Sequence, residues 1–275
     1  MRTVDLARET EEKTLHWLKR FGYLTSKQLA LLLFEDGRHT SKAAVTRLAQ
    51  YTLKRLEDGG FLVADKKPCN PAYYAMSLRG CRRIDVPGKY GKDALRHINN
   101  HRTLANSIAA YYVFDENKVW TEREIQRKEA PFKVFGRKVP DVLIETFTEQ
   151  YTDYHWIEIE ASKKATRDVN ATVDWLRNYA FPPYFNRETQ RWEPNCQPIS
   201  GMGNCRITCV TFMILDKTAA NLERRIAARF KELNRAEYFE ELRHNVRFWP
   251  ETYCRKMLEL DASELAERYS PPQEQ

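Results

Sequence analysis

The sequence has few cysteines and no long apolar segment. Its six cysteines are scattered over 275 residues without a C-x-x-C pair, which predicts reduced thiols rather than a disulfide framework. No stretch approaches the roughly 18 consecutive apolar residues of a membrane-spanning helix. The first residues, MRTVDLARETEEK, are too acidic and polar for a secretory signal. We therefore expect a cytoplasmic protein without a membrane partner.

The sequence also lacks the short motifs of several enzyme classes. It contains no P-loop, no dinucleotide-binding fingerprint and no nucleophile elbow, which argues against the functions that depend on them. Three cysteines could be combined with His244 or Cys254 into a zinc site, but their spacing favours ordinary packing. These are Cys196, Cys205 and Cys209.

Excess positive charge is confined to the first third of the chain. Residues 1–90 contain 17 Lys and Arg against 10 Asp and Glu, a net charge of +7. The whole chain has 45 Lys and Arg and 38 Asp and Glu, so residues 91–275 contain 28 of each sign and have a net charge of zero. The length favours two domains. A basic domain beside a neutral one favours contact with a polyanion such as nucleic acid.

Three helices are expected in the first domain. Residues 5–21 carry apolar side chains at helical spacing, and residues 28–34 form a short apolar helix. Thr25, followed three positions later by Gln28, is the capping-box pattern that begins such a helix. A third helix ends near Asp58. Three helices with a tight connection before the third predict a helix-turn-helix arrangement.

The third helix has two different faces. Val45, Leu48, Thr52 and Leu56 follow helical spacing and are expected to face the core. The opposite face carries side chains that suit phosphate contacts and base reading in the major groove of duplex DNA. These predicted DNA-binding residues are Lys42, Thr46, Arg47, Gln50, Lys54 and Arg55.

A β-hairpin is expected after the third helix. Its strands are residues 61–64 and 72–78, and Lys66 and Lys67 lie near the tip of the loop, where they would contact the DNA backbone. A short helix follows at residues 80–84.

The segments LTSKQLA, AAVTRLAQYTLKRLEDGGFLVADKK and YYAMSLRGCRRI together resemble winged-helix domains of bacterial and mobile-element regulators. The resemblance implies a winged helix-turn-helix DNA-binding domain over residues 1–90. A winged helix used only for protein interaction is the alternative, and the segregated charge favours DNA.

Residues 91–275 alternate strands and helices, the pattern of an α/β core. A helical connection at 93–113 precedes this core, and a long polar loop at 181–205 interrupts it. Tyr184, Phe185 and Trp192 in the loop either stack on unpaired bases or anchor the loop to the core. Strands are expected at 139–147, 155–161, 207–215 and 246–249, helices at 166–179 and 219–234, and either element at 119–125.

Two of the expected strands carry acidic side chains. Asp141 begins one strand, and Glu158 and Glu160 lie two apart on the next, so they share a face of the sheet. Buried carboxylates on neighbouring strands need a cation, here Mg²⁺ or Mn²⁺, with all three acids as candidate ligands. With Lys163 just past the strand end, the pattern is typical of a metal-dependent nuclease. In the alternative interpretation, Asp141 is a turn residue and both glutamates lie on the solvated face of an edge strand.

The segments KVPDVLIETF and YHWIEIEASKK look like the restriction-endonuclease-like, PD-(D/E)XK superfamily. With the winged helix ahead of them and EREI upstream, residues 24–180 are similar to the replication-relaxation family of plasmids and integrative conjugative elements. The resemblance implies that Asp141 and Glu158 bind the metal, with Glu122 or Glu124 as an extra carboxylate. Glu160 stands where the superfamily has its lysine. Either Lys163 replaces that lysine from the strand end, or the site no longer cleaves.

The expected protein is thus a winged helix-turn-helix followed, over residues 91–275, by a restriction-endonuclease-like α/β domain. The leading hypothesis is a DNA-binding protein of a bacterial mobile element, with a nuclease-like domain that no longer cuts. Its expected partners are double-stranded DNA, a second copy of the chain, and proteins of the replication or transfer machinery. The alternative is an active metal-dependent endonuclease that cuts at sites selected by the winged helix.

Overall fold

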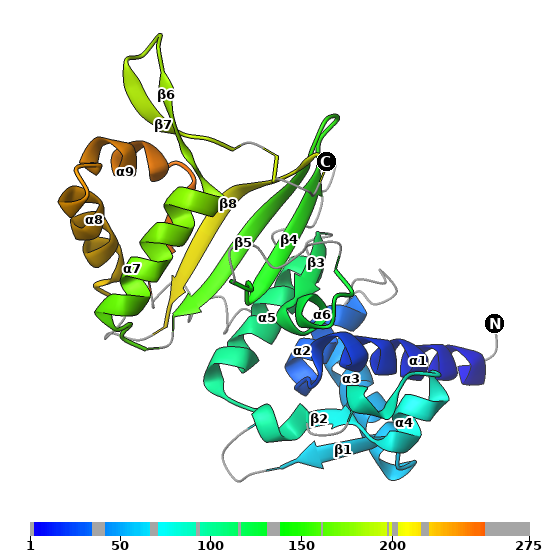
Figure 1. Cartoon of the computed structure of the whole chain (residues 1–275). Coiled ribbons are helices and arrows are strands. Elements are labelled where there is room, and N and C mark those ends of the chain that lie inside the picture. Colours follow the sequence, from blue (N-terminus) through cyan, green and yellow to red (C-terminus); the bar gives the residue numbers. More distant parts are fainter. Residues whose placement is uncertain are drawn as a thin grey trace, which may run out of the picture. The chain divides into compact units, whose positions relative to one another are not determined.

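The computed structural model describes residues 3–34, 42–66, 71–91, 94–114, 117–130, 138–160, 162–196, 198–199, 203–215 and 220–250 (Figure 1). The chain divides into two compact units, Met1–Glu116 with Leu258–Gln275 and Asn117–Met257. The fold combines helices with a five-stranded mixed sheet, which confirms the predicted mixed α/β class. No described helix is long and apolar enough to cross a membrane.

The three predicted helices begin the first unit. They are α1 (Thr3–Phe21), α2 (Ser26–Phe34) and α3 (Lys42–Asp58). The capping box before α2 is confirmed, because Thr25 N donates to Gln28 Oε1 at 2.8 Å and Gln28 N donates to Thr25 Oγ1 at 3.2 Å. This reciprocal pair supplies partners to two backbone donors that the helix itself leaves unbonded.

The predicted hairpin follows α3. β1 (Leu62–Asp65) pairs antiparallel with β2 (Tyr73–Met76). Leu24 adds a bridge to β2, since its N donates to the Tyr74 carbonyl at 3.0 Å and its carbonyl accepts from Tyr74 N at 2.9 Å. The next helix, α4 (Leu78–Arg83), begins two residues earlier than predicted, because Ser77 Oγ caps it by accepting from Gly80 N at 3.1 Å.

The boundary between the units differs from the sequence prediction near residue 90. α5 (Asn100–Phe114) belongs to the first unit. Buried polar bonds hold it there, since Gln28 Nε2 donates to Ser107 Oγ at 2.8 Å and Asn106 Nδ2 donates to the Tyr23 carbonyl at 2.8 Å. Residues 91–116 carry three basic and three acidic side chains, so the first 116 residues keep the net charge of +7. Two 3-10 turns, η1 (Gly88–Tyr90) and η2 (Ala94–His97), precede α5.

The second unit is built on a sheet with the strand order β3-β4-β5-β8-β9. The first three strands are antiparallel neighbours, whereas β5, β8 and β9 run parallel to one another. Parallel neighbours require a crossover connection, and the segment between β5 and β8 contains the helix α7. The strands are β3 (Lys118–Thr121), β4 (Val142–Phe147), β5 (Thr152–Glu160), β8 (Cys205–Ile214) and β9 (Val246–Trp249).

The helices of this unit follow the predicted pattern with two additions. The ambiguous segment at 119–125 contains both elements, because β3 ends at Thr121 and α6 begins at the next residue. A short helix after the predicted 219–234 segment was not expected from the sequence. The helices are α6 (Glu122–Gln126), α7 (Thr166–Trp175) with a π-helical turn (Leu176–Ala180), α8 (Leu222–Glu232) and α9 (Ala236–Leu242).

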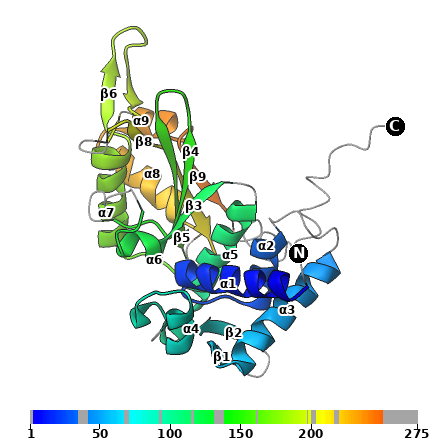
Figure 2. The same ribbon diagram turned by 90° about the vertical axis from the view of Figure 1, so that its right-hand side faces the viewer.

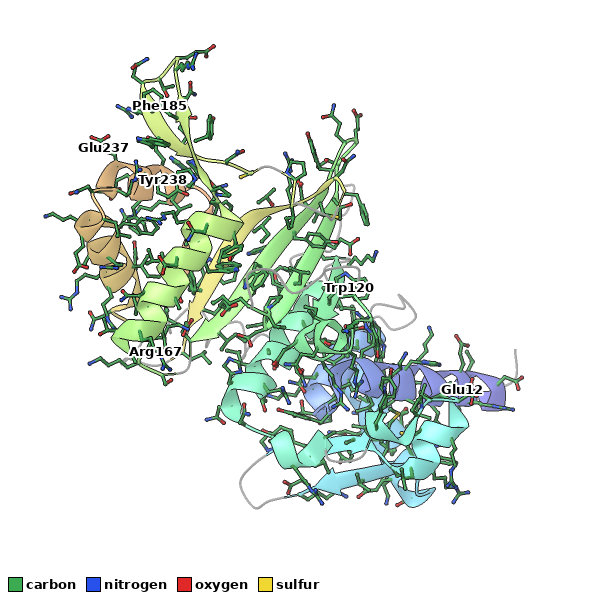
Figure 3. The ribbon with its side chains drawn as sticks, viewed as in Figure 1. Glu12, Trp120, Arg167, Phe185, Glu237 and Tyr238 are labelled. Carbon is green, nitrogen blue, oxygen red and sulfur yellow. The ribbon has the colours of Figure 1, made fainter. Side chains whose placement is uncertain are left out.

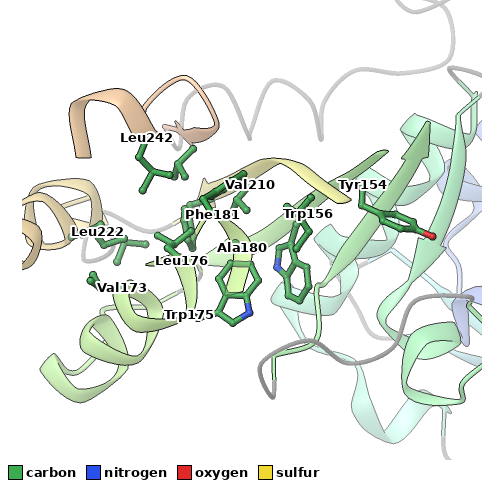
Figure 4. Packing of buried hydrophobic residues seen from close by; sticks show 14 of the residues in the cluster. Tyr154, Trp156, Val173, Trp175, Leu176, Ala180, Phe181, Val210, Leu222 and Leu242 are labelled. Atoms are coloured by element: carbon green, nitrogen blue, oxygen red, sulfur yellow. The ribbon is translucent and has the colours of Figure 1, made fainter. Parts of the chain in front are cut away.

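The core of the second unit lies between the sheet and these helices (Figure 4). Trp156 on β5 is fully buried, and its ring lies 4.6 Å from that of Trp175 on α7. Val173 from α7 and Phe212 from β8 are equally buried. Because side chains alternate along a strand, Glu158 and Glu160 point to the same face of the sheet as Trp156.

The loop predicted at 181–205 contains a second hairpin, β6 (Pro183–Asn186) and β7 (Arg191–Pro194). It extends beyond the end of the sheet in both views (Figures 1 and 2), and Phe185 lies on the extended part (Figure 3). The rings of Phe185 and Trp192 lie 5.5 Å apart and are 43% and 38% exposed. These two aromatic side chains therefore pack on each other, and the Arg235 guanidinium, between α8 and α9, lies 4.4 Å from the centre of the Trp192 ring.

Candidate functional site

The outward face of α3 is the first candidate site. Val45, Thr52 and Leu56 are buried as predicted, while Leu48 is only half-buried. Ala49 and Leu53 complete the buried stripe. On the other side, Arg47, Gln50 and Lys54 are exposed and Thr46 is half-buried. Tyr51, which the sequence interpretation missed, is 67% exposed in the middle of this face.

The cations of α3 differ in how firmly they are held. Within the described residues Arg47 forms no ion pair, and Lys54 pairs with Asp58 at 3.1 Å one turn further on. Arg55 instead contacts the carboxylate of Glu11 on α1, which also accepts from Arg83 at 2.6 Å. Arg55 therefore joins α3 to α1, whereas Arg47 is available to a ligand. The Lys42 side chain lies outside the described residues.

Of the two hairpin lysines, Lys66 lies within the described residues, directly after β1. Lys67 lies outside the described residues. Lys66 Nζ lies 2.7 Å from both carboxylate oxygens of Glu57, near the end of α3. This hydrogen bond to Glu57 raises the pKa of Lys66. An exposed pair of this kind contributes little stability, so a phosphate can compete with Glu57 for the ammonium.

The carboxylates predicted on neighbouring strands form the second candidate site. Asp141 directly precedes β4 and lies against β5, since its N donates to the Ile157 carbonyl at 3.0 Å and its Oδ2 accepts from Ile159 N at 2.7 Å. It thus flanks Glu158 on the neighbouring strand, as the sequence predicts. One oxygen of the Asp141 carboxylate is bonded to the backbone of that strand.

Two lysines that sequence reasoning missed lie beside the glutamates. Lys138 Nζ donates to Glu158 Oε2 at 2.9 Å, and Trp156 Nε1 donates to the other oxygen of Glu158 at 2.5 Å. Lys164 Nζ lies 2.8 Å from Glu160 Oε1. Both carboxylates therefore have an ammonium group as their counter-charge.

Glu160 is the carboxylate of this group whose pKa is shifted by burial. It is 4% exposed, and its Oε1 lies 2.8 Å from Lys164 Nζ. Burial raises the pKa of Glu160, and the Lys164 ammonium lowers it in part. The chain thus holds a carboxylate in an environment that favours its neutral form.

The edge-strand interpretation of Glu158 and Glu160 is wrong. β5 lies between β4 and β8 in the sheet, and both side chains are buried. Asp141 itself lies at a bend directly before β4, so it does not begin the strand, and its backbone and carboxylate bond to β5.

The side chains of the remaining predicted residues are exposed or bonded elsewhere. Lys163 is exposed, and Lys164 instead meets Glu160. Glu122 N donates to the Asp141 carbonyl at 3.2 Å, but its Oε1 accepts from Gln126 at 2.5 Å. Glu124 caps α6, because its Oε2 accepts from the backbone N of Thr121 at 2.9 Å.

The described residues do not fit a divalent-metal site as they are arranged. They contain no group of three or more His, Cys, Asp and Glu side chains placed to hold a metal ion. Asp141, Glu158 and Glu160 have the oxygen donors that Mg²⁺ prefers. However, two of the three are neutralised by Lys138 and Lys164.

Comparison of the chain with protein-family models, with curated proteins and with solved structures gives no match.

Proposed function

We propose that this chain is a DNA-binding protein that docks on duplex DNA through α3 and the β1–β2 hairpin. The observation that carries the proposal is the outward face of α3. Arg47, Gln50, Tyr51 and Lys54 follow one another there at helical spacing, while the opposite face is buried. An α-helix fits the major groove, where Arg and Gln read base edges, and Tyr and Lys contact phosphates.

The charge distribution supports this proposal. Residues 1–116 carry a net charge of +7, equal to that of the whole chain, and a basic segment draws a polyanion from a distance. Three helices followed by a two-stranded hairpin are also the element order of a winged helix-turn-helix domain, which we assign to the first unit on this basis.

The resemblance to the replication-relaxation family supplies the biological setting of the proposal. The protein would act in the replication, transfer or regulation of a bacterial plasmid or conjugative element. A second copy on a paired half-site and proteins of the replication or transfer machinery would be its further partners.

The second unit is, in this proposal, a restriction-endonuclease-like domain that does not cleave DNA. The placement of Asp141 beside Glu158 on neighbouring strands supports the likeness. The ion pairs of Lys138 with Glu158 and of Lys164 with Glu160 support the loss of activity, because the lysines supply the positive charge that a metal would bring. The domain would then act as a dimerisation, protein-contact or second DNA-binding surface.

Two arginines of the same helix provide a matched test of the DNA contact. Arg47→Ala is expected to weaken binding by about tenfold or more, because an arginine–base pair contributes roughly 1–3 kcal/mol. Arg55→Ala is expected to change affinity much less, since Glu11 already holds that guanidinium. Fluorescence anisotropy with a duplex selected from a random pool measures both. Equal losses in the two variants would contradict the assignment of the outward face.

The proposed absence of cleavage is tested with supercoiled and single-stranded DNA in Mg²⁺ or Mn²⁺. We expect the wild-type protein to leave both substrates as intact as the Asp141→Ala variant does, while gel shifts show that both proteins bind the duplex. Nicking by the wild type that disappears in Asp141→Ala would instead establish the metal-dependent endonuclease.

A further inference from the structure

The first unit contains a pocket that the proposed DNA contacts do not use. Its volume is about 530 Å³, within the range of small-molecule sites. Residues of β1, β2, α4 and η2 line it. The first three of these elements lie together in both ribbon views (Figures 1 and 2).

The pocket wall is largely apolar and open to solvent. Val63 and Leu78 are 45% and 54% exposed, and Met76 and Leu95 lie deeper. Exposed apolar side chains that gather around a hollow indicate a binding site more often than chance exposure. An occupant with an apolar body would remove these side chains from water.

The charged groups of the described lining are positive. Arg79 and Arg96 are the charged residues among the described residues that line the pocket. The Arg79 guanidinium lies 4.7 Å from the centre of the Phe61 ring and forms no ion pair with the described residues. Ring contact holds a guanidinium in place while its N–H groups stay free for a carboxylate.

The other polar group of the lining is already bonded. Ser77 Oγ donates to the Gly60 carbonyl at 2.7 Å and accepts from Gly80 N at 3.1 Å. Among the described residues of the lining, a ligand therefore meets apolar side chains, the guanidinium of Arg79 against the Phe61 ring, and the side chain of Arg96. This combination selects an anion with an apolar body.

Two glycines of the lining, Gly91 and Gly60, mark a close backbone approach and the end of α3. A Cβ atom on Gly91 would lie 2.2 Å from the Met76 carbonyl oxygen, so glycine lets the chain pass directly against β2. Gly60, two residues after α3, has a positive φ of 71° and belongs to the lining. An occupant would thus contact the segment that joins α3 to the hairpin.

We infer that this pocket binds a small amphiphilic carboxylate, with an aliphatic or aryl body against Val63 and Leu78 and its carboxylate on Arg79. The side chains proposed to contact DNA, those of α3 and Lys66, do not line the pocket, although Val63 and Met76 of the β1–β2 hairpin do. The chain would then have a small-molecule ligand in its DNA-docking unit.

Three compounds with the same chain length test the inference directly. Octanoate, octan-1-ol and octylammonium are titrated against the full-length protein loaded with the fluorescent anion 8-anilinonaphthalene-1-sulfonate. Octanoate is expected to displace the probe at a concentration about tenfold lower than octan-1-ol, since a hydrogen bond to a charged group is worth that factor or more. Octylammonium is expected to be the weakest competitor.

Variants assign the displacement to this pocket. Arg79→Met is expected to remove the preference for octanoate over octan-1-ol, and Leu78→Glu to abolish displacement by octanoate. Arg82→Met is the matched control, because Arg82 is an exposed arginine of the same helix outside the lining. Equal displacement by all three compounds, or an equal loss of preference in Arg79→Met and Arg82→Met, would overturn the inference. Thermal unfolding of each variant checks that it is folded.

Discussion

Trp156→Ala is expected to lower the free energy of unfolding of the second unit by about 3–5 kcal/mol, the usual cost of removing a large buried aromatic side chain. Trp156 is fully buried on a central strand and packs against Trp175. Its Nε1 also donates to Glu158, so alanine leaves a cavity and a buried carboxylate with one donor fewer. Urea unfolding followed by circular dichroism measures the effect.

Trp192→Ala is the control for this prediction, because Trp192 lies on the extended hairpin and is more than a third exposed. We expect it to cost about 1 kcal/mol or less, the scale of one exposed ring contact. Trp156→Phe keeps a ring but removes the donor to Glu158. Its cost in stability is expected to lie between those of Trp156→Ala and Trp192→Ala. Equal costs for Trp156→Ala and Trp192→Ala would show that the core is not centred on β5.

Gly80→Ala is expected to destabilise the first unit by about 3 kcal/mol, at the upper end of the cost of overpacking. An added Cβ would lie 2.2 Å from the Phe61 carbonyl oxygen. That carbonyl cannot easily move away, since it accepts from Ser77 N at 2.9 Å. A loss of stability would be informative, because replacing glycine by alanine within a helix normally raises the free energy of unfolding by about 1 kcal/mol.

Thermal unfolding of Gly80→Ala beside Arg82→Ala measures this effect. Arg82 is an exposed residue of the same helix, and its replacement is expected to change stability by no more than about 0.5 kcal/mol. A Gly80→Ala protein as stable as the wild type would mean that α4 does not pack closely against Phe61.

The parts of the fold that depend on neighbours in sequence could be predicted from the sequence. The capping box of Thr25 and Gln28, the three helices and the first hairpin each follow from local spacing. The assignment of α5 could not be predicted this way. Its place in the first unit depends on bonds from Gln28 and Asn106 to residues more than 70 positions away.

The carboxylates of the candidate site could likewise be predicted from the sequence, whereas their lysine partners could not. Alternation along β5 places Glu158 and Glu160 on one face, and strand pairing brings Asp141 beside them. The lysines did not follow from the pattern. Lys138 precedes β4 and its partner Glu158 is on β5, so the pair depends on how the strands align. Lys164 pairs with Glu160, four positions earlier in the chain, whereas the sequence pattern predicted Lys163 for this role.

The central claim, that α3 docks on duplex DNA, is tested most directly by the salt dependence of DNA binding. We expect the logarithm of the association constant to fall with the logarithm of salt concentration with a slope steeper than about −3, since each displaced phosphate counterion adds about −0.9. Arg47→Ala is expected to make the slope shallower or to relax sequence preference, whereas Arg55→Ala leaves both unchanged. An affinity that does not change with salt, or no binding to any duplex at low salt, would contradict the account.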